Sequence, residues 1–211
     1  MSVKPHKGAV AAGDLNTAQA AADVLKAGGN AFDAVVAALF ASTVAEPVLS
    51  SLGGGGFLLA HPAGGKPMVY DFFAHTPVRK KSEVDFYPVL ADFGTVTQEF
   101  HIGLGAMATP GVVRGAFEVI RDLGTLSVRD LMAPAQALAR GGFRVSPLQA
   151  YILDVVGPIY RATASCRAQY ASPADLDKLI GAGEHLRLVD SADFLDALAQ
   201  EGDDLDRKSV V

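Results

Sequence analysis

The pattern of apolar and polar positions predicts a strand and then a helix at the start of the chain. Residues 8–13 are short, apolar and flanked by glycines, which favours a buried strand. A helix is expected to start at Asn16, where Gln19 stands three residues later and completes a capping box. Gly28 follows the last apolar position and is expected to end this helix.

A second helix is predicted from Asn30. Its apolar residues repeat at intervals of three to four, and most of its other positions are alanine. A helix without a polar face is buried on all sides, so we expect this one to lie within a layered core. It should end before Pro47, which leaves Glu46 at its boundary.

A glycine loop and a β-hairpin are expected next. The loop opens directly into an apolar run at 57–60, and a five-residue connection leads to a second apolar run at 68–73. Consecutive glycines suit backbone that bends through positive φ or that lies very close to another segment. The loop is therefore a candidate wall of a site, and the alternative is a tight bend beside a packed hairpin. The four glycines are Gly53, Gly54, Gly55 and Gly56.

Two well-known glycine motifs are excluded by the order of elements. A P-loop needs Gly-Lys-Ser/Thr leading into a helix, whereas the last glycine here is followed by Phe57 and a strand. A dinucleotide-binding turn needs a strand before the glycines and a helix after them, which is the reverse of this order.

The remaining half is predicted to be mainly helical. Residues 78–104 show no sustained period but carry four aromatic residues, and a connection of that kind is usually a functional cover or packs against a partner. A short strand is expected at 106–109, before Pro110. Helices are predicted over 112–123, from Ser127 to Arg140, and over 191–201. Two further helices are expected to start at caps formed by Ser146 and Ser172.

Composition limits the class of protein. The chain has 211 residues, is 50% apolar and carries a formal charge of −5, so it can bury a substantial core and offers no basic surface for nucleic acid. Cys166 is the only cysteine, which excludes an internal disulfide and a cysteine-based metal site, and no cofactor is expected. No apolar run reaches the roughly 18 residues of a membrane span. Without a signal sequence we expect a cytoplasmic protein, or a periplasmic or secreted one if a signal was removed.

The predicted strands are too few for a closed sandwich. About four strand candidates occur, and a hairpin that is apolar on both faces would be an open, aggregation-prone edge. We therefore expect an α/β part over 1–110 and a helical part over 111–211 docked on it, with the missing strands supplied by another chain.

Five groups of residues together resemble the large subunit of γ-glutamyltranspeptidase. Their order and spacing both fit, and the resemblance spans about residues 8–202. The groups are residues 28–34, Glu46-Pro47 through 53–57, 71–77, 109–115, and 131–135 with 142–145.

The resemblance implies an αββα N-terminal-nucleophile (Ntn) hydrolase made as a self-cleaving precursor. In the family the nucleophile is the threonine that begins the small subunit, and its α-amine serves as base. Thr109 precedes a proline within a matched segment, and no other threonine here fits such a cleavage site. We therefore expect no catalytic residue in this chain, and we expect a small-subunit partner that carries the threonine.

The substrate side of the resemblance departs from the family at Phe73. Members that act on γ-glutamyl compounds carry Arg-Glu after the strand's aspartate, and the arginine holds the substrate's α-carboxylate. Here Phe73 and Ala74 follow Asp71-Phe72. A phenyl ring cannot bind a carboxylate, so selection for glutamyl groups is in doubt.

Several single residues have two interpretations. Phe73 either lines the substrate pocket or is a core aromatic, and His75 either contacts substrate or is a surface residue. Glu46 is expected to be a cap or ion-pair partner and not a catalytic acid, and Cys166 is expected to be buried and inert. The basic cluster 79–81 either replaces the missing arginine or is a solvated loop face.

Two functions remain open from the sequence. The first is the large-subunit portion of an amidohydrolase or acyltransferase of glutathione-type metabolism, acting on a small-molecule amide, with no nucleic acid or membrane partner. The second is a non-catalytic binding or scaffold protein that kept the shell of the fold.

Overall fold

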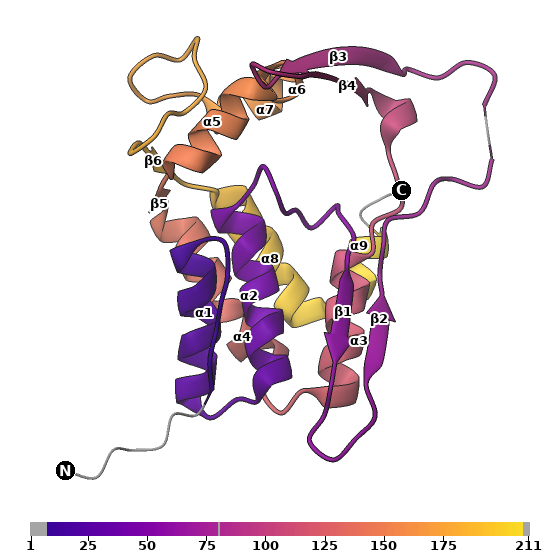
Figure 1. Cartoon of the computed structure of the whole chain (residues 1–211), viewed down its shortest axis with the longest axis vertical. Coiled ribbons are helices and arrows are strands. Elements are labelled where there is room, and N and C mark those ends of the chain that lie inside the picture. Colours follow the sequence, from indigo (N-terminus) through magenta and orange to yellow (C-terminus); the bar gives the residue numbers. More distant parts are fainter. Residues whose placement is uncertain (1–7, 80, 209–211) are drawn as a thin grey trace. The chain divides into compact units, whose positions relative to one another are not determined.

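This computed structural model describes residues 8–79 and 81–208 (Figure 1). These residues form two units, and each unit is built from segments that are separated in the sequence. The first unit takes residues up to 74, residues 110–141 and residues from 188 on. The second takes residues 75–109 and 142–187. Each unit therefore draws on both of the ranges 1–110 and 111–211, because helices from the second half of the chain pack on the N-terminal helices.

Helices α1 (Leu15–Ala27) and α2 (Ala31–Ala45) begin the first unit and pack against each other. Helix α1 starts one residue earlier than predicted, because the Asp14 side chain accepts the Asn16 N–H at 2.7 Å and is the N-cap. Gln19 binds Asp23 instead of completing a capping box. The end of α1 is as predicted, with Gly28 at a φ of 103°.

Helix α2 forms where the sequence predicts it and is largely buried, but it is not buried on all sides. Asn30 caps it and makes a reciprocal capping box with Asp33, and Glu46 is its C-terminal cap. Val36, Phe40 and Val44 are buried, although Val35 keeps 42% of its surface exposed.

Asp33 is a buried carboxylate that ties α2 to a distant turn. Besides the Asn30 N–H, it accepts hydrogen bonds from the Thr125 N–H, the Thr125 hydroxyl and the Leu126 N–H. Burial raises the pKa of the Asp33 carboxyl, but these hydrogen bonds outweigh burial and bring the pKa below its ordinary value. The segment 28–34 therefore has a structural role, because Asp33 within it joins α2 to the turn at residues 125–126.

Three further helices complete the helical layer of the first unit. Helix α4 (Val128–Gly141) packs between α2 and α8 (Val189–Glu201), and α3 (Val112–Leu123) packs on α2. As predicted, α3 ends at Gly124 and Ser127 caps the start of α4. The short helix α9 (Asp204–Lys208) follows α8.

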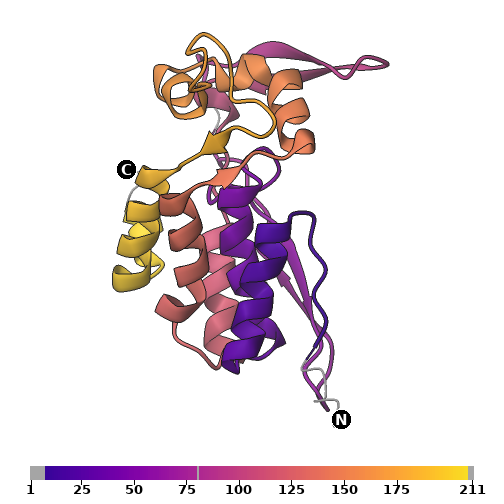
Figure 2. The ribbon, with the colours of Figure 1, turned by 90° about the vertical axis from the view of Figure 1, so that its left-hand side faces the viewer.

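The predicted hairpin is present as β1 (Phe57–Ala60) and β2 (Met68–Asp71), paired antiparallel with Phe57 opposite Asp71. In the turned view of Figure 2 it lies along one side of the helices. Its inner face meets α3, where the Tyr70 hydroxyl donates to Asp122 at 3.0 Å. Its outer face is apolar and open, with Phe57, Leu59 and Val69 exposed by 64%, 73% and 66%. The sheet is thus not closed by the described residues, as the strand accounting predicted.

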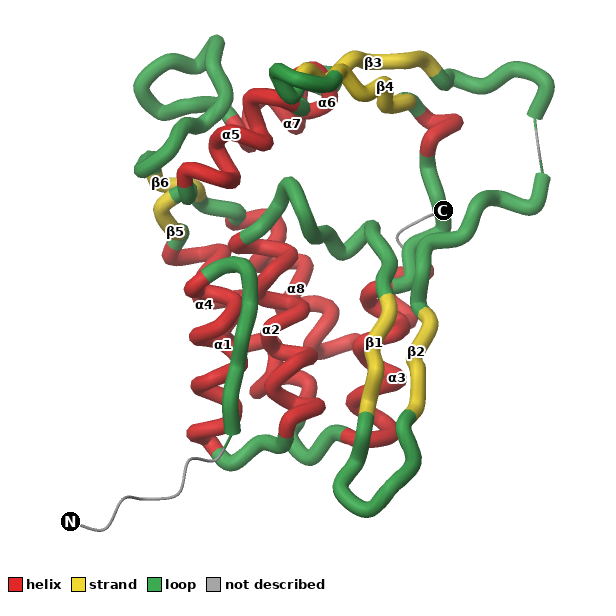
Figure 3. Tube along the Cα trace, viewed as in Figure 1, coloured by secondary structure: helices red, strands yellow, loops and turns green. Residues whose placement is uncertain are grey.

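The second unit combines short helices with two small sheets, as the strand and helix colours of Figure 3 show. Strands β3 (Tyr87–Asp92) and β4 (Thr97–Ile102) pair antiparallel, and β3 packs on α6 (Gly157–Tyr160). The other elements are η1 (Leu104–Ala106), β5 (Phe143–Arg144), α5 (Pro147–Val155), α7 (Ala164–Tyr170) and β6 (His185–Leu186).

The β3–β4 hairpin was not predicted. Pro88 interrupts the apolar pattern of the first strand, and the second strand alternates weakly. The turn does carry signals: Gly94 has a φ of 84° and its N–H binds the Asp92 carboxylate at 2.7 Å.

Three other predictions of elements were wrong. Residues 8–13 form no strand, because no described segment pairs with them. The strand expected at 106–109 is reduced to a single bridge between Thr109 and His75. Ser172 starts a closed loop and not a helix, since its hydroxyl donates to Glu184 and its N–H donates to the Lys178 carbonyl.

Ser146 caps α5 as predicted and accepts the Gln149 N–H. In the part of the chain that the structure describes, none of the helices has the length and apolar character needed to span a bilayer.

Candidate functional site

The glycine loop joins the hairpin to the start of α3. The Gly54 carbonyl accepts the N–H groups of Gly111 and Val112 at 2.9 and 3.2 Å, so it caps the first turn of α3. Gly56 exchanges two backbone hydrogen bonds with Phe72, which extends the β1–β2 pairing by one residue pair. The loop is therefore fixed at both ends by backbone hydrogen bonds.

Close packing explains why glycine occupies Gly55. A Cβ atom there would lie 2.8 Å from the Cα of Phe73 and closer still to the backbone nitrogen of Ala74. Real Cβ atoms do not approach backbone so closely, so any side chain would push the Phe73 strand away.

Two glycines of the α3 region make room for Phe72. A Cβ at Gly111 would lie 2.7 Å from the Phe72 carbonyl carbon, and a Cβ at Gly115 would overlap the Phe72 side chain. Gly56 faces the same ring, 3.0 Å from where its own Cβ would be. We call Gly56, Gly111 and Gly115 the Phe72 cradle. The cradle fixes the position of residue 72 and therefore the direction of the residue that follows it.

Phe73 lies at the end of the extended hairpin and stacks on Phe57. The two ring centroids are 5.5 Å apart with an angle of 15° between the planes. The Phe73 N–H binds the Asp71 carboxylate at 3.0 Å, and 54% of the Phe73 surface is exposed. The ring is thus held by its neighbours but available to a ligand.

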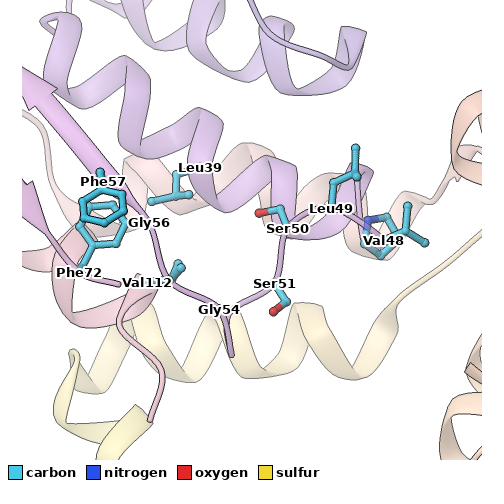
Figure 4. Close-up of a pocket in the computed structure, with 12 residues that line it drawn as sticks. Leu39, Val48, Leu49, Ser50, Ser51, Gly54, Gly56, Phe57, Phe72 and Val112 are labelled. Atoms are coloured by element: carbon cyan, nitrogen blue, oxygen red, sulfur yellow. The ribbon is translucent and has the colours of Figure 1, made fainter. Parts of the chain in front are cut away.

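A hollow of about 340 Å³ lies beside the glycine loop (Figure 4). Phe57 lines it, whereas Phe73, which stacks on Phe57, is not one of the lining residues. The lining residues are Leu39, Pro47, Val48, Leu49, Ser50, Ser51, Gly54, Gly55, Gly56, Phe57, Phe72 and Val112.

The two arginines of α3 are engaged by carboxylates. Arg114 binds Asp203 at 2.7 Å, and Arg121 binds Glu118 at 2.8 Å and Asp203 at 3.3 Å. Hydrogen bonding to Glu118 and Asp203 outweighs burial and raises the pKa of Arg121. These ion pairs hold the residues after α8 against α3, so neither guanidinium is free to bind a substrate carboxylate.

The other residues singled out from the sequence lie elsewhere. His75 belongs to the second unit, where it is exposed and its backbone pairs with Thr109. Glu46 caps α2 and accepts the Thr17 hydroxyl at 2.7 Å. Cys166 is half-buried in α7, and the expectation of full burial was wrong because α7 contributes no buried residue. Arg79 and Lys81 are exposed in the second unit, and Lys80 lies outside the described residues.

The sequence interpretation missed Phe57, Gly111 and Gly115. A signal was present, since Gly111 and Gly115 lie four residues apart and so face the same side of a helix start. It could not be assigned to Phe72, because no sequence pattern says which strand residue packs there.

A helical layer against an open hairpin, with a glycine loop at the end of the hairpin, defines one layer pair of an α/β sandwich. The chain matches the gamma-glutamyltranspeptidase family over residues 17–206. It therefore belongs to that family, a group of hydrolases and transferases.

Two curated relatives have different activities in their names. The chain is 40% identical over 133 residues to the acylase ACY 1 proenzyme of Pseudomonas sp. (strain V22), a match that covers 61% of this chain and 24% of that protein. It is 35% identical over 199 residues to the glutathione hydrolase proenzyme of Pseudomonas aeruginosa, which covers 93% of this chain and 33% of that protein. The matches thus cover about a quarter of the first relative and a third of the second, well under two thirds of either.

The fold has close solved counterparts. Against the gamma-glutamyltranspeptidase of Pseudomonas nitroreducens, solved with L-DON, the TM-score is 0.74 at 28% identity, covering 95% of this chain and 57% of that chain. The architecture is accordingly that of the αββα Ntn hydrolases, of which this chain holds a part.

Proposed function

We propose that this chain is the large-subunit portion of a γ-glutamyltranspeptidase-like amidohydrolase or acyltransferase. The nucleophilic threonine would begin a second chain, the small subunit, made from the same precursor. Two observations support this: the relatives are named proenzymes of which the matches cover only 24% and 33%, and the outer face of β1–β2 is apolar and open. Strands of the second chain would cover that face.

The reaction would use the threonine hydroxyl of the second chain. Its oxygen attacks the carbonyl carbon of an amide while its own α-amine takes the hydroxyl proton. The amide C–N bond breaks, the amine leaves with that proton, and the acyl group stays on the threonine as an ester. Water or an amine then takes the acyl group. The large subunit would contribute walls of the acyl site and no catalytic group.

We further propose that the acyl site does not select γ-glutamyl groups. The observation that carries this is Phe73, half-exposed and stacked on Phe57 where the family arginine is expected. The α3 arginines are paired with Asp203 and Glu118, so they do not replace that cation. The similarity to an acylase supports the same conclusion.

The energetic consequence of Phe73 can be estimated. A charge-assisted hydrogen bond contributes about 1.5–3 kcal/mol, which corresponds to roughly ten- to a hundred-fold in a specificity ratio. A ring also disfavours a carboxylate, because the ion would lose water without gaining a partner.

The test uses the complete enzyme and two matched anilides. We expect the kcat/KM of butanoyl anilide, which lacks the α-amino and α-carboxylate groups, to exceed that of γ-glutamyl anilide. Phe73→Arg should move this ratio toward γ-glutamyl by roughly ten- to a hundred-fold, whereas the uncharged Phe73→Gln should not. A strong preference of the unmodified enzyme for γ-glutamyl anilide would contradict the proposal and point to the 79–81 cluster.

A further inference from the structure

We propose that the hollow beside the glycine loop binds the body of an apolar acyl group that carries no charge at its far end. This inference rests on the proposed function, because it names the class of acyl donor that the same site would take. It assigns a role to residues on α2, at the start of α3 and in the loop before the hairpin. The argument about glutamyl selection at Phe73 does not use these residues.

The lining of the hollow has the chemistry of an acyl-chain site. Every lining side chain is apolar or a serine, and no charged side chain takes part. In Figure 4, Phe57 and Phe72 lie on one side, Val48 and Leu49 on the other, and Leu39 lies between them. A zwitterionic glutamyl group would find no counter-ion here, whereas a hydrocarbon chain would lose water on three sides.

Polar groups at the loop could orient the carbonyl end of such a ligand. The Gly55 N–H has no acceptor among the described residues, and the exposed Ser51 hydroxyl makes no hydrogen bond there either. Ser50 is already paired with Ser42 at 2.9 Å. An uncharged acyl donor needs only one or two such donors beside an apolar wall.

One side of the hollow is fixed before a ligand binds. Phe72 is held by the cradle of Gly56, Gly111 and Gly115, and Val112 is the first residue of α3, capped by the Gly54 carbonyl. Leu39 is carried by the buried helix α2. Because these three side chains would lose little freedom on binding, this side of the hollow is preorganised for a ligand.

The size of the hollow limits the length of the chain. Its volume of about 340 Å³ lies at the lower end of the range for small-molecule sites. At roughly 30 Å³ for each non-hydrogen atom, taking water as the measure, it holds on the order of ten atoms. Medium-length acyl chains would fill it.

The experiment measures kcat/KM of the complete enzyme for propanoyl, butanoyl, hexanoyl and octanoyl anilides. We expect an increase of about fourfold for each methylene until the hollow is filled. Leu39→Trp should fill the hollow from α2 and flatten this increase, with little change for propanoyl anilide. Ser51→Trp, from the exposed rim, gives a second route if Leu39→Trp does not fold. Leu15→Trp, at a residue on α1 that is 80% exposed and does not line the hollow, is the matched control.

A binding measurement separates this inference from the proposed function. Calorimetry with octanamide should show a Kd that rises roughly tenfold in Leu39→Trp or Ser51→Trp, equivalent to the loss of about two methylene contacts, and does not change in Leu15→Trp. If no anilide is turned over but octanamide behaves in this way, the proposed reaction fails and the hollow is a binding site. If chain length has no effect, or if Leu15→Trp flattens the series as strongly as the other two variants, the inference is overturned.

Discussion

At the scale of single residues, neighbouring glycines of the loop have different reasons to be glycine. Gly55 is pressed against the Phe73–Ala74 backbone, whereas a Cβ at Gly53 would meet nothing nearer than the Ser51 hydroxyl oxygen at 3.8 Å. Gly53 also does not have a positive φ. Packing therefore requires glycine at position 55 but not at position 53.

Alanine substitutions should therefore have opposite effects at these two positions. Gly55→Ala should destabilise the protein by about 1–3 kcal/mol, because the backbone of residues 73 and 74 must move. Gly53→Ala should be neutral or stabilise it by up to about 1 kcal/mol, since alanine restricts the unfolded chain. Urea denaturation of both variants measures this difference. Equal losses of stability would mean that the loop does not pack as described.

The residue scale also shows what the sequence could and could not predict about the site. The glycine loop and Phe73 were identified from residue types and their order. The partner of Phe73 was not, because Phe57 is set by how the hairpin pairs. His75 was grouped with Phe73 by closeness in sequence, yet the two residues fall in different units.

At the scale of elements, Asp33 joins the start of α2 to the turn between α3 and α4. Its carboxylate accepts four hydrogen bonds, and two of them come from the backbone N–H groups of Thr125 and Leu126. The side chain is fully buried. An uncharged amide cannot accept all of these bonds, so this junction depends on the ionised form.

Asp33→Asn should lower the free energy of unfolding by roughly 2–3 kcal/mol at neutral pH. Because the folded pKa of Asp33 lies below its unfolded value, its contribution is complete above about pH 4 and is lost as pH falls through the folded pKa. The difference between wild type and variant should therefore shrink in acid. Asp23→Asn, on the exposed face of α1, is the control and should change stability little. A difference that stays constant from neutral to acid pH would exclude the ionised carboxylate as the cause.

Elements with strong local signals were predicted correctly, and elements defined by distant partners were not. Asn30, Gly28 and Ser146 act within one turn of their own helix, so their patterns sufficed. Residues 8–13 were expected to be a strand, but a strand exists only where another strand pairs with it. Ser172 carries a helix-cap sequence but binds Glu184, twelve residues away, and this contact closes a loop instead.

At the scale of the whole molecule, the apolar outer face of β1–β2 carries the larger proposal. Phe57, Leu59 and Val69 lie on that face and are mostly exposed in the described residues. Apolar residues at alternating positions of paired strands mark a face that packs on another layer. The relatives are named proenzymes, and the matches cover only 24% and 33% of their length, which is consistent with a further chain as that layer.

The most direct measurement is mass spectrometry and N-terminal sequencing of every polypeptide that copurifies with this chain in the active protein. We predict a second chain of roughly 20 kDa, the size of a separate small domain, that begins with threonine. Removal of that chain should abolish amide hydrolysis. Amide hydrolysis by residues 1–211 after complete removal of any companion would contradict the account.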